Sequence, residues 1–162
     1  MKLEIVEKIK NGNRVALARA ISFIEQADET SRRLLDELFP LAGHAHILGI
    51  TGPPGAGKSS VTDRLIEKIR AAGKTVAVVC IDPSSPFSGG AILGDRIRMQ
   101  NHASDSGVFI RSLGTRGQHG GLSRSTKDVV MALDAAKFDW IIVETAGVGQ
   151  TELEILKLAH CV

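Results

Sequence analysis

Apolar residues recur along the chain with two different periods, and the change comes near residue 46. Over the first forty residues they return every three or four positions, as Val6 and Ile9 do and as Ile21 and Ile24 do again. This is the period of an amphipathic helix, and an Asn-Gly-Asn and an Asp-Glu-Thr sequence interrupt it. The pattern therefore predicts two or three short helices in an N-terminal helical segment over residues 1–43.

From residue 46 short apolar runs alternate with helical stretches. The runs are rich in β-branched residues, and all but one lack the alternation of a half-exposed strand, which predicts strands buried on both faces. Alternating strands and helices indicate an α/β fold with a mostly parallel central sheet covered by helices. We expect strands at 46–51, 75–81, 108–113 and 140–144, and helices at about 58–72, 122–137 and 152–160.

Composition restricts the class of protein. A chain of 162 residues with 43% hydrophobic residues can bury one sizeable core, so a single domain over 44–162 is expected after the helical segment. The net charge of +2 is spread along the sequence, which indicates neither a nucleic acid nor a membrane as partner. The charged start and the lack of a long apolar run predict a cytoplasmic protein. Cys80 and Cys161 have apolar neighbours and are expected to be buried and reduced.

The stretch GPPGAGKSS follows the first predicted strand. Gly52, Gly57, Lys58 and Ser59 match the phosphate-binding pattern G-x-x-x-x-G-K-S/T, between a strand and a helix as the motif requires. Its glycines let the backbone wrap around phosphates with N–H groups pointing inward, and the helix start adds partial positive charge. Lys58 is then expected to reach the β- and γ-phosphates and the Ser59 hydroxyl to bind Mg²⁺. The alternative is a Gly/Pro-rich turn without a ligand.

Carboxylates follow three apolar or glycine-rich stretches. Glu144 ends a predicted buried strand, where Mg²⁺ at a nucleotide needs oxygen ligands, so we expect it at the metal, directly or through its shell. The N–H of Gly147 is expected at the γ-phosphate. A carboxylate that caps the next helix is the alternative for Glu144. Asp82 also ends an apolar strand and Asp95 lies in a Gly-rich loop; both are candidate metal ligands, with an Asx turn or a helix cap as the alternative.

Four stretches together carry a family resemblance: GITGPPGAGKSS, IDPSSPFSGGAILGDRIRM, FIRSLGTRGQHGGLSR and FDWIIVETAGVGQTE. In this combination the chain resembles the MeaB/ArgK-type GTPases, the methylmalonyl-CoA mutase-associated proteins. The resemblance implies a P-loop NTPase fold, binding of GTP and GDP with Mg²⁺, and hydrolysis of GTP. It also implies a homodimer that serves as chaperone for an adenosylcobalamin-dependent acyl-CoA mutase, gating cofactor loading and protecting the mutase.

The resemblance also implies roles for particular residues. Lys58 and Glu144 are expected to be catalytic, and Ser59, Asp82, Asp95 and Glu144 to hold Mg²⁺ directly or through water. The implied nucleotide contacts are Gly52, Pro53, Pro54, Gly55, Ala56, Gly57, Lys58, Ser59, Ser60 and Gly147.

The chain also departs from the family pattern. Members carry a later N-K-x-D motif that reads guanine, a further switch and a dimerisation arm, so the sequence looks like the front part of a longer protein. Preference for GTP over ATP is therefore implied by the resemblance alone. Val148 follows Gly147 where a glutamine could orient the attacking water, so slow intrinsic hydrolysis is expected. The alternatives are a P-loop ATPase or kinase that phosphorylates a small molecule or a transport protein, and a module that binds nucleotide without useful hydrolysis.

Overall fold

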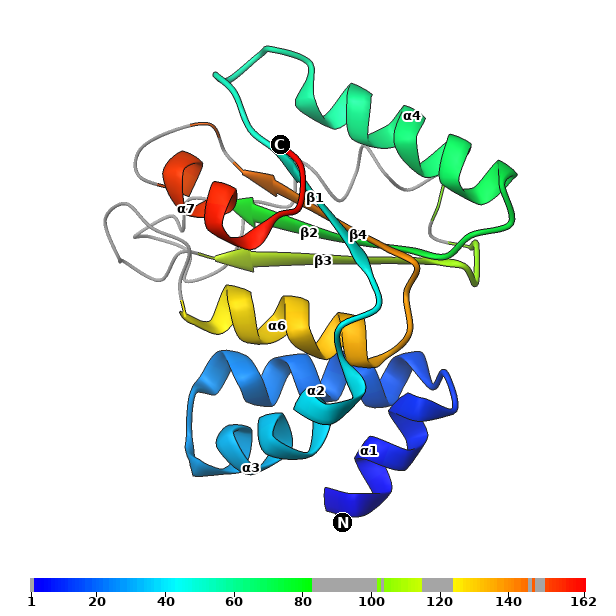
Figure 1. Cartoon of the computed structure of the whole chain (residues 1–162), viewed down its shortest axis with the longest axis vertical. Coiled ribbons are helices and arrows are strands. Elements are labelled where there is room, and N and C mark those ends of the chain that lie inside the picture. The colour runs from blue at the N-terminus through cyan, green and yellow to red at the C-terminus, as the bar shows by residue number, and fades with distance from the viewer. Residues whose placement is uncertain (1, 83–101, 103, 115–123, 146, 148–150) are drawn as a thin grey trace. The chain divides into compact units, whose positions relative to one another are not determined.

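The computed structural model describes residues 2–82, 102, 104–114, 124–145, 147 and 151–162, and it divides into two compact units (Figure 1). The first unit contains Met1–Ala45 and Arg124–Asp139, and the second contains His46–Ser123 and Trp140–Val162. The division after Ala45 lies close to the predicted end of the helical segment. The first unit also takes in a helix from much later in the chain, whose Leu133 is fully buried. That helix contributes to a core that the first forty residues are too few to build alone.

The helices of the first unit begin where the sequence shows its polar interruptions. The Asn13 side chain accepts a hydrogen bond from the Ala16 N–H at 2.9 Å, and the Asp28 side chain accepts one from the Ser31 N–H at 2.8 Å. Both residues are N-caps, so the predicted breaks are helix starts. The helices are α1 (Lys2–Lys10), α2 (Arg14–Gln26), α3 (Glu29–Leu38) and α6 (Arg124–Ala135), with a short 3-10 helix, η1 (Phe39–Leu41).

The second unit is built on four parallel strands in the order β1-β4-β2-β3. β4 lies between β1 and β2, so Glu144 has Ile50 beside it on one strand and Cys80 on the other. This confirms the predicted α/β fold with a parallel sheet, and each predicted element end is right to within two residues. The elements are β1 (His46–Ile50), α4 (Lys58–Ala71), β2 (Val76–Asp82), β3 (Val108–Gly114), β4 (Trp140–Thr145) and α7 (Thr151–Leu158).

Alternation along the strands sorts their residues onto two faces of the sheet. Ile66 of α4 packs with Val78 and Ile142 on one face. Gly49 belongs to the other face of β1, where a Cβ would come within 2.9 Å of the Ile155 side chain of α7. Helices therefore lie on both faces, α4 on one and α7 at the β1 end of the other (Figure 1). Full burial of Ile66 and of Ile142 stabilises the fold by roughly 1.5–3 kcal/mol each.

β3 ends the strand order, and its burial is correspondingly partial. All of its residues except Leu113 are half-buried, whereas β4 is buried from Ile141 to Thr145. Among the described strands only β2 pairs with β3, which fits this partial burial.

One of the two predicted buried cysteines is exposed. Cys80 lies in β2 and is buried, but the prediction for Cys161 is wrong because its side chain is exposed. The backbone accounts for its place: the Cys161 carbonyl accepts a hydrogen bond from the Gly49 N–H at 2.8 Å, beside β1. Apolar neighbours in sequence therefore did not indicate burial at a position held by main-chain bonds.

The helices are short. α4 has 14 residues, and within the described ranges no helix combines the length and apolarity that crossing a membrane requires.

Candidate functional site

The turn between β1 and α4 is open to solvent. Residues 53–57 are exposed, and a Cβ placed on Gly52, Gly55 or Gly57 would meet no atom within 4 Å. Gly57 is the N-cap of α4 with φ 88°, a left-handed conformation that favours glycine, and no side chain in the described part of the chain caps the helix there. α4 therefore begins at an exposed turn without a side-chain cap, as an anion site at a helix start requires.

Lys58 begins α4 and carries its charge back to the start of the turn. Its Nζ donates to the Gly52 carbonyl at 2.8 Å and to the Pro53 carbonyl at 3.0 Å. The turn thus has exposed backbone amides and an ammonium group within one short segment. This is the arrangement that the phosphate-binding motif predicts.

Glu144 reaches the same helix from β4. Trp140 and Ile142 face α4, so the alternation of the strand turns Glu144 toward α4 as well. The carboxylate is 4% exposed, and its Oε1 accepts a hydrogen bond from the Ser59 hydroxyl at 2.7 Å. Its Oε2 accepts one from the Thr62 hydroxyl, also at 2.7 Å. Because both oxygens face α4, this geometry favours the metal-site interpretation over a cap for the next helix.

Gly147 lies directly against the phosphate-binding turn. A Cβ on Gly147, whose φ is 80°, would fall 1.7 Å from the Gly52 carbonyl oxygen and 3.0 Å from Lys58 Nζ. Thr145 is tied to the same place, because its hydroxyl bonds that of Thr51 at 3.0 Å. The fold therefore brings together five residues predicted from the sequence: Gly52, Lys58, Ser59, Glu144 and Gly147.

The oxygen atoms at Ser59 and Glu144 fit Mg²⁺. Mg²⁺ prefers hard oxygen ligands and, at nucleotides, uses one or two protein groups together with phosphate oxygens and waters. A hydroxyl and a buried carboxylate 2.7 Å apart supply such groups beside the turn. Of the other two predicted ligands, Asp82 is the last residue of β2 but its side chain lies outside the described residues, as does all of Asp95. Among the residues described, there is no cluster of three or more His, Cys, Asp or Glu side chains that could hold a metal ion. Mg²⁺ at this site would therefore also need phosphate oxygens and waters as ligands.

Thr62 is a contact of Glu144 that the sequence analysis did not identify. The motif ends at Ser59, and Thr62 lies three residues later in the row of α4 that also buries Ile66 and Ile69. A threonine in an otherwise apolar helical row is a weak signal of a buried polar contact, and it could have been noticed.

Asp134 of α6 is a second buried polar residue that the sequence analysis missed. Its carboxylate accepts hydrogen bonds from the N–H groups of Gly43, His44 and Ala45, at 2.6, 2.9 and 2.9 Å. It fixes the backbone immediately before β1, within the first unit, and has a structural role. The signal was an aspartate inside the apolar stretch VVMALDAA.

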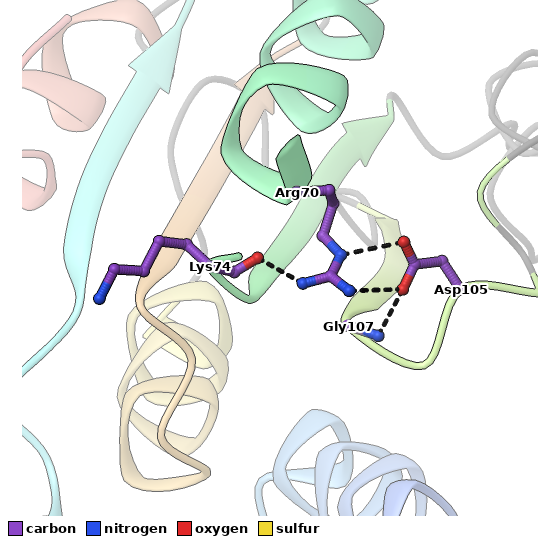
Figure 2. A network of polar contacts seen from close by, with 4 residues as sticks. All are labelled: Arg70, Lys74, Asp105 and Gly107. Carbon is purple, nitrogen blue, oxygen red and sulfur yellow. Dashed lines mark hydrogen bonds and ion pairs between the residues drawn. The ribbon is translucent and has the colours of Figure 1, made fainter. Parts of the chain in front are cut away.

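The far end of α4 is tied to the segment before β3 (Figure 2). Arg70 donates to both carboxylate oxygens of Asp105, at 2.9 and 3.0 Å, and to the Lys74 carbonyl at 2.6 Å, while the Gly107 N–H donates to Asp105 at 2.7 Å. The Arg70 guanidinium, and after it the Gly107 N–H, lower the pKa of Asp105. This ion pair, at the opposite end of α4 from Lys58, is structural.

The chain is similar to known proteins over nearly its whole length. Residues 17–162 match the family model described as methylmalonyl Co-A mutase-associated GTPase MeaB. The chain is 54% identical over 159 residues to a Pyrococcus abyssi protein classed by name among the GTPases, and 38% identical over 162 residues to the GTPase ArgK of Escherichia coli. Each match covers 98% of this chain and 49% of the relative, so the chain spans about half the length of these relatives.

Two further matches are a longer protein that contains a similar segment and a solved crystal structure. The chain is 43% identical over 156 residues to the fused isobutyryl-CoA mutase of Cupriavidus metallidurans, a match that covers 93% of this chain and 14% of that protein. The crystal structure of a LAO/AO transport system kinase superposes with a TM-score of 0.77 at 30% identity, over 98% of this chain and 47% of that one. The second unit thus has the P-loop NTPase fold, as predicted. The chain belongs to the MeaB family of methylmalonyl-CoA mutase-associated GTPases.

Proposed function

We propose that this chain binds GTP and GDP with Mg²⁺ at the turn before α4 and hydrolyses the bond between the β- and γ-phosphates of GTP. The observation that carries the proposal is the contact of Ser59 with the buried Glu144, beside Lys58 and Gly147. A phosphate-binding turn alone is a generic feature. A carboxylate delivered to its serine from another strand is what a Mg²⁺-dependent nucleotide site requires.

The backbone amides of the turn hold the phosphates, together with the start of α4. Lys58 exchanges its contacts with the Gly52 and Pro53 carbonyls for the β- and γ-phosphates, since three N–H donors on a flexible stem allow this. The proposed nucleotide contacts are Gly52, Pro53, Pro54, Gly55, Ala56, Gly57, Lys58, Ser59, Ser60 and Gly147.

Ser59 holds the metal through its hydroxyl oxygen. That hydroxyl has one proton and donates it to Glu144, which leaves the oxygen lone pairs for a cation. Bound Mg²⁺ supplies charge neutralisation for the β- and γ-phosphates. Asp82 and Asp95 complete the proposed metal site on the strength of the family resemblance.

Lys58 and Glu144 are the proposed catalytic residues. Lys58 offsets negative charge that develops at the β–γ bridge, and Glu144 keeps the metal-binding serine in position. The residue directly after Gly147 is Val148, not a glutamine that could orient the attacking water, so the intrinsic rate is slow and a partner that orders this segment accelerates it.

The proposed partner is an adenosylcobalamin-dependent acyl-CoA mutase, for which the protein acts as a cytoplasmic, homodimeric chaperone that gates cofactor loading. The family description names methylmalonyl-CoA mutase, and in the Cupriavidus metallidurans relative the matching segment and an isobutyryl-CoA mutase share one polypeptide. In this proposal the GTPase domain is 44–162 and the helical segment 1–43 precedes it.

Nucleotide titration tests the site. We expect Lys58→Ala to reduce GTP affinity by about a hundredfold or more, because the lost ammonium contacts two charged phosphates. Lys68→Ala, an exposed lysine of the same helix, is the matched control and should bind GTP as the wild type does. Equal GTP affinity in the wild type and Lys58→Ala would refute the proposed site. Phosphate release measured with GTP and with ATP, with and without a cobalamin-dependent mutase, then tests the base preference and the partner.

A second candidate function is phosphoryl transfer to a small molecule or a transport protein. It is favoured by the superposition on the LAO/AO transport system kinase. It predicts that nucleotide consumption depends on an added acceptor and that the γ-phosphoryl group appears on that acceptor. Release of the γ-phosphate as inorganic phosphate, stimulated by a mutase, would instead support the first proposal.

A further inference from the structure

Thr62 makes a contact that neither the phosphate-binding motif nor the proposed nucleotide contacts include. Its side chain is 0% exposed, and its hydroxyl donates to Glu144 Oε2 at 2.7 Å. Ser59 donates to the other oxygen of the same carboxylate at the same distance. Residues three apart lie on one face of a helix, so α4 presents two hydroxyls side by side to a single carboxylate.

The count of protons fixes the direction of these bonds. An ionised carboxylate only accepts, so Ser59 and Thr62 must each donate their one hydroxyl proton to Glu144. The Thr62 oxygen also lies 3.1 Å from the Lys58 carbonyl, which is another acceptor. The Thr62 hydroxyl proton therefore goes to Glu144 while that carboxylate faces α4. When the carboxylate turns away, the Lys58 carbonyl is the acceptor that remains for this proton.

The buried hydroxyl of Thr62 needs a hydrogen-bond acceptor. Thr62 shares its row on α4 with Ile66 and Ile69, where valine would fill the same volume. A hydroxyl buried in such a row is unfavourable unless it is bonded to a strong acceptor. Glu144 is that acceptor, and bonds to both of its oxygens fix the plane of the carboxylate.

We propose that Thr62 is a positioning residue that orients Glu144, and through it the Ser59 hydroxyl, for Mg²⁺; this inference rests on the proposed function. With Oε2 held by Thr62, Oε1 stays directed at Ser59 and the serine lone pairs stay directed away from the carboxylate. Without Thr62 the carboxylate can rotate, and the serine loses its fixed acceptor. Residues that orient metal ligands affect metal affinity by about tenfold to a hundredfold.

The test compares Thr62→Val, which keeps the shape and removes the donor, with Thr62→Ser, which keeps the donor. The readout is the Mg²⁺ concentration that gives half-maximal binding of a fluorescent GTP analogue, with thermal unfolding of the nucleotide-free protein measured in parallel. We expect Thr62→Val to raise that concentration about tenfold and Thr62→Ser to change it by less than about twofold. Thr126→Val, at a buried threonine of the first unit, is the control and should leave it unchanged.

An unchanged Mg²⁺ requirement in Thr62→Val would overturn the inference. A rise in Thr62→Ser as large as that in Thr62→Val would also overturn it. If Thr62→Val does not fold, the same change is made in Glu144→Ala, where no carboxylate is left for Thr62 to orient and no charge is left buried and unpaired. There Thr62→Val should have no further effect on the Mg²⁺ requirement, and a further rise would count against action through Glu144. If the wild-type protein shows no Mg²⁺-dependent GTP binding, the proposed function itself is refuted.

Discussion

Asp134 in the first unit and Glu144 in the second are both buried carboxylates, but they are held in opposite ways. Asp134 accepts three hydrogen bonds from backbone N–H groups, which are fixed donors. Glu144 accepts two from the hydroxyls of Ser59 and Thr62, which rotate and can also accept. A carboxylate held by fixed donors suits a structural role. One held by rotating hydroxyls can exchange partners, as a metal site requires.

The largest effect on stability is expected for Asp134→Asn. The amide keeps one acceptor, but its NH₂ group must face a backbone N–H that cannot turn away. Two donors then face each other without an acceptor, and the remaining hydrogen bonds lose the negative charge of their acceptor. The free energy of unfolding, measured by urea denaturation, should therefore fall by about 3 kcal/mol. GTP affinity of the folded protein should be unchanged, since none of the proposed nucleotide contacts involves Asp134. A loss of less than about 0.5 kcal/mol would contradict the structural role.

Glu144→Gln makes the matching change in the second unit and should give the reverse result. Here the Thr62 hydroxyl can turn its proton to the Lys58 carbonyl and accept from the new NH₂ group. The free energy of unfolding should change by less than about 1 kcal/mol, while the Mg²⁺ concentration needed for GTP binding should rise about tenfold or more. If Glu144→Gln destabilises the protein as much as Asp134→Asn and leaves the Mg²⁺ requirement alone, the contrast between the two carboxylates fails.

The smallest effect is expected at a third carboxylate, the more exposed Asp105. Arg70 lowers its pKa in the folded protein, so the folded state favours the ionised form more than the unfolded chain does. Its contribution to stability is therefore fully present above the ordinary aspartate pKa of about 3.9 and is lost as the pH falls through the lowered value. In Asp105→Asn, the decline in unfolding free energy between about pH 5 and about pH 3 should be shallower than in the wild type.

Urea denaturation across that pH range measures the slope. Asp36→Asn, at an exposed aspartate of α3, is the control and should keep the wild-type slope. Identical slopes for Asp105→Asn and the wild type would show that the ion pair with Arg70 contributes nothing to the free energy of unfolding in solution.

The sequence predicted those parts of the fold and site that follow from local patterns. Apolar runs and helical periods located the strands and helices. The phosphate-binding motif located Lys58 and Ser59, and strand alternation is enough to explain why Glu144 reaches α4. These features need only neighbours in sequence and the regular geometry of strands and helices.

The features that sequence did not predict depend on contacts between distant segments. Asp134 meets Gly43–Ala45 about ninety positions away, and Thr62 meets Glu144 over a similar separation. No period or motif in a single sequence encodes such pairings. The exposure of Cys161 was missed for the same reason, since main-chain bonds to β1 decide it. The placement of Asp95 stays a prediction.

The closeness of Gly147 to the Gly52 carbonyl has a steric consequence. Even a methyl group on Gly147 would overlap that oxygen, so any other residue at this position would force one of the two backbones to move. Glycine at position 147 is therefore what makes this close approach to the turn after β1 sterically possible.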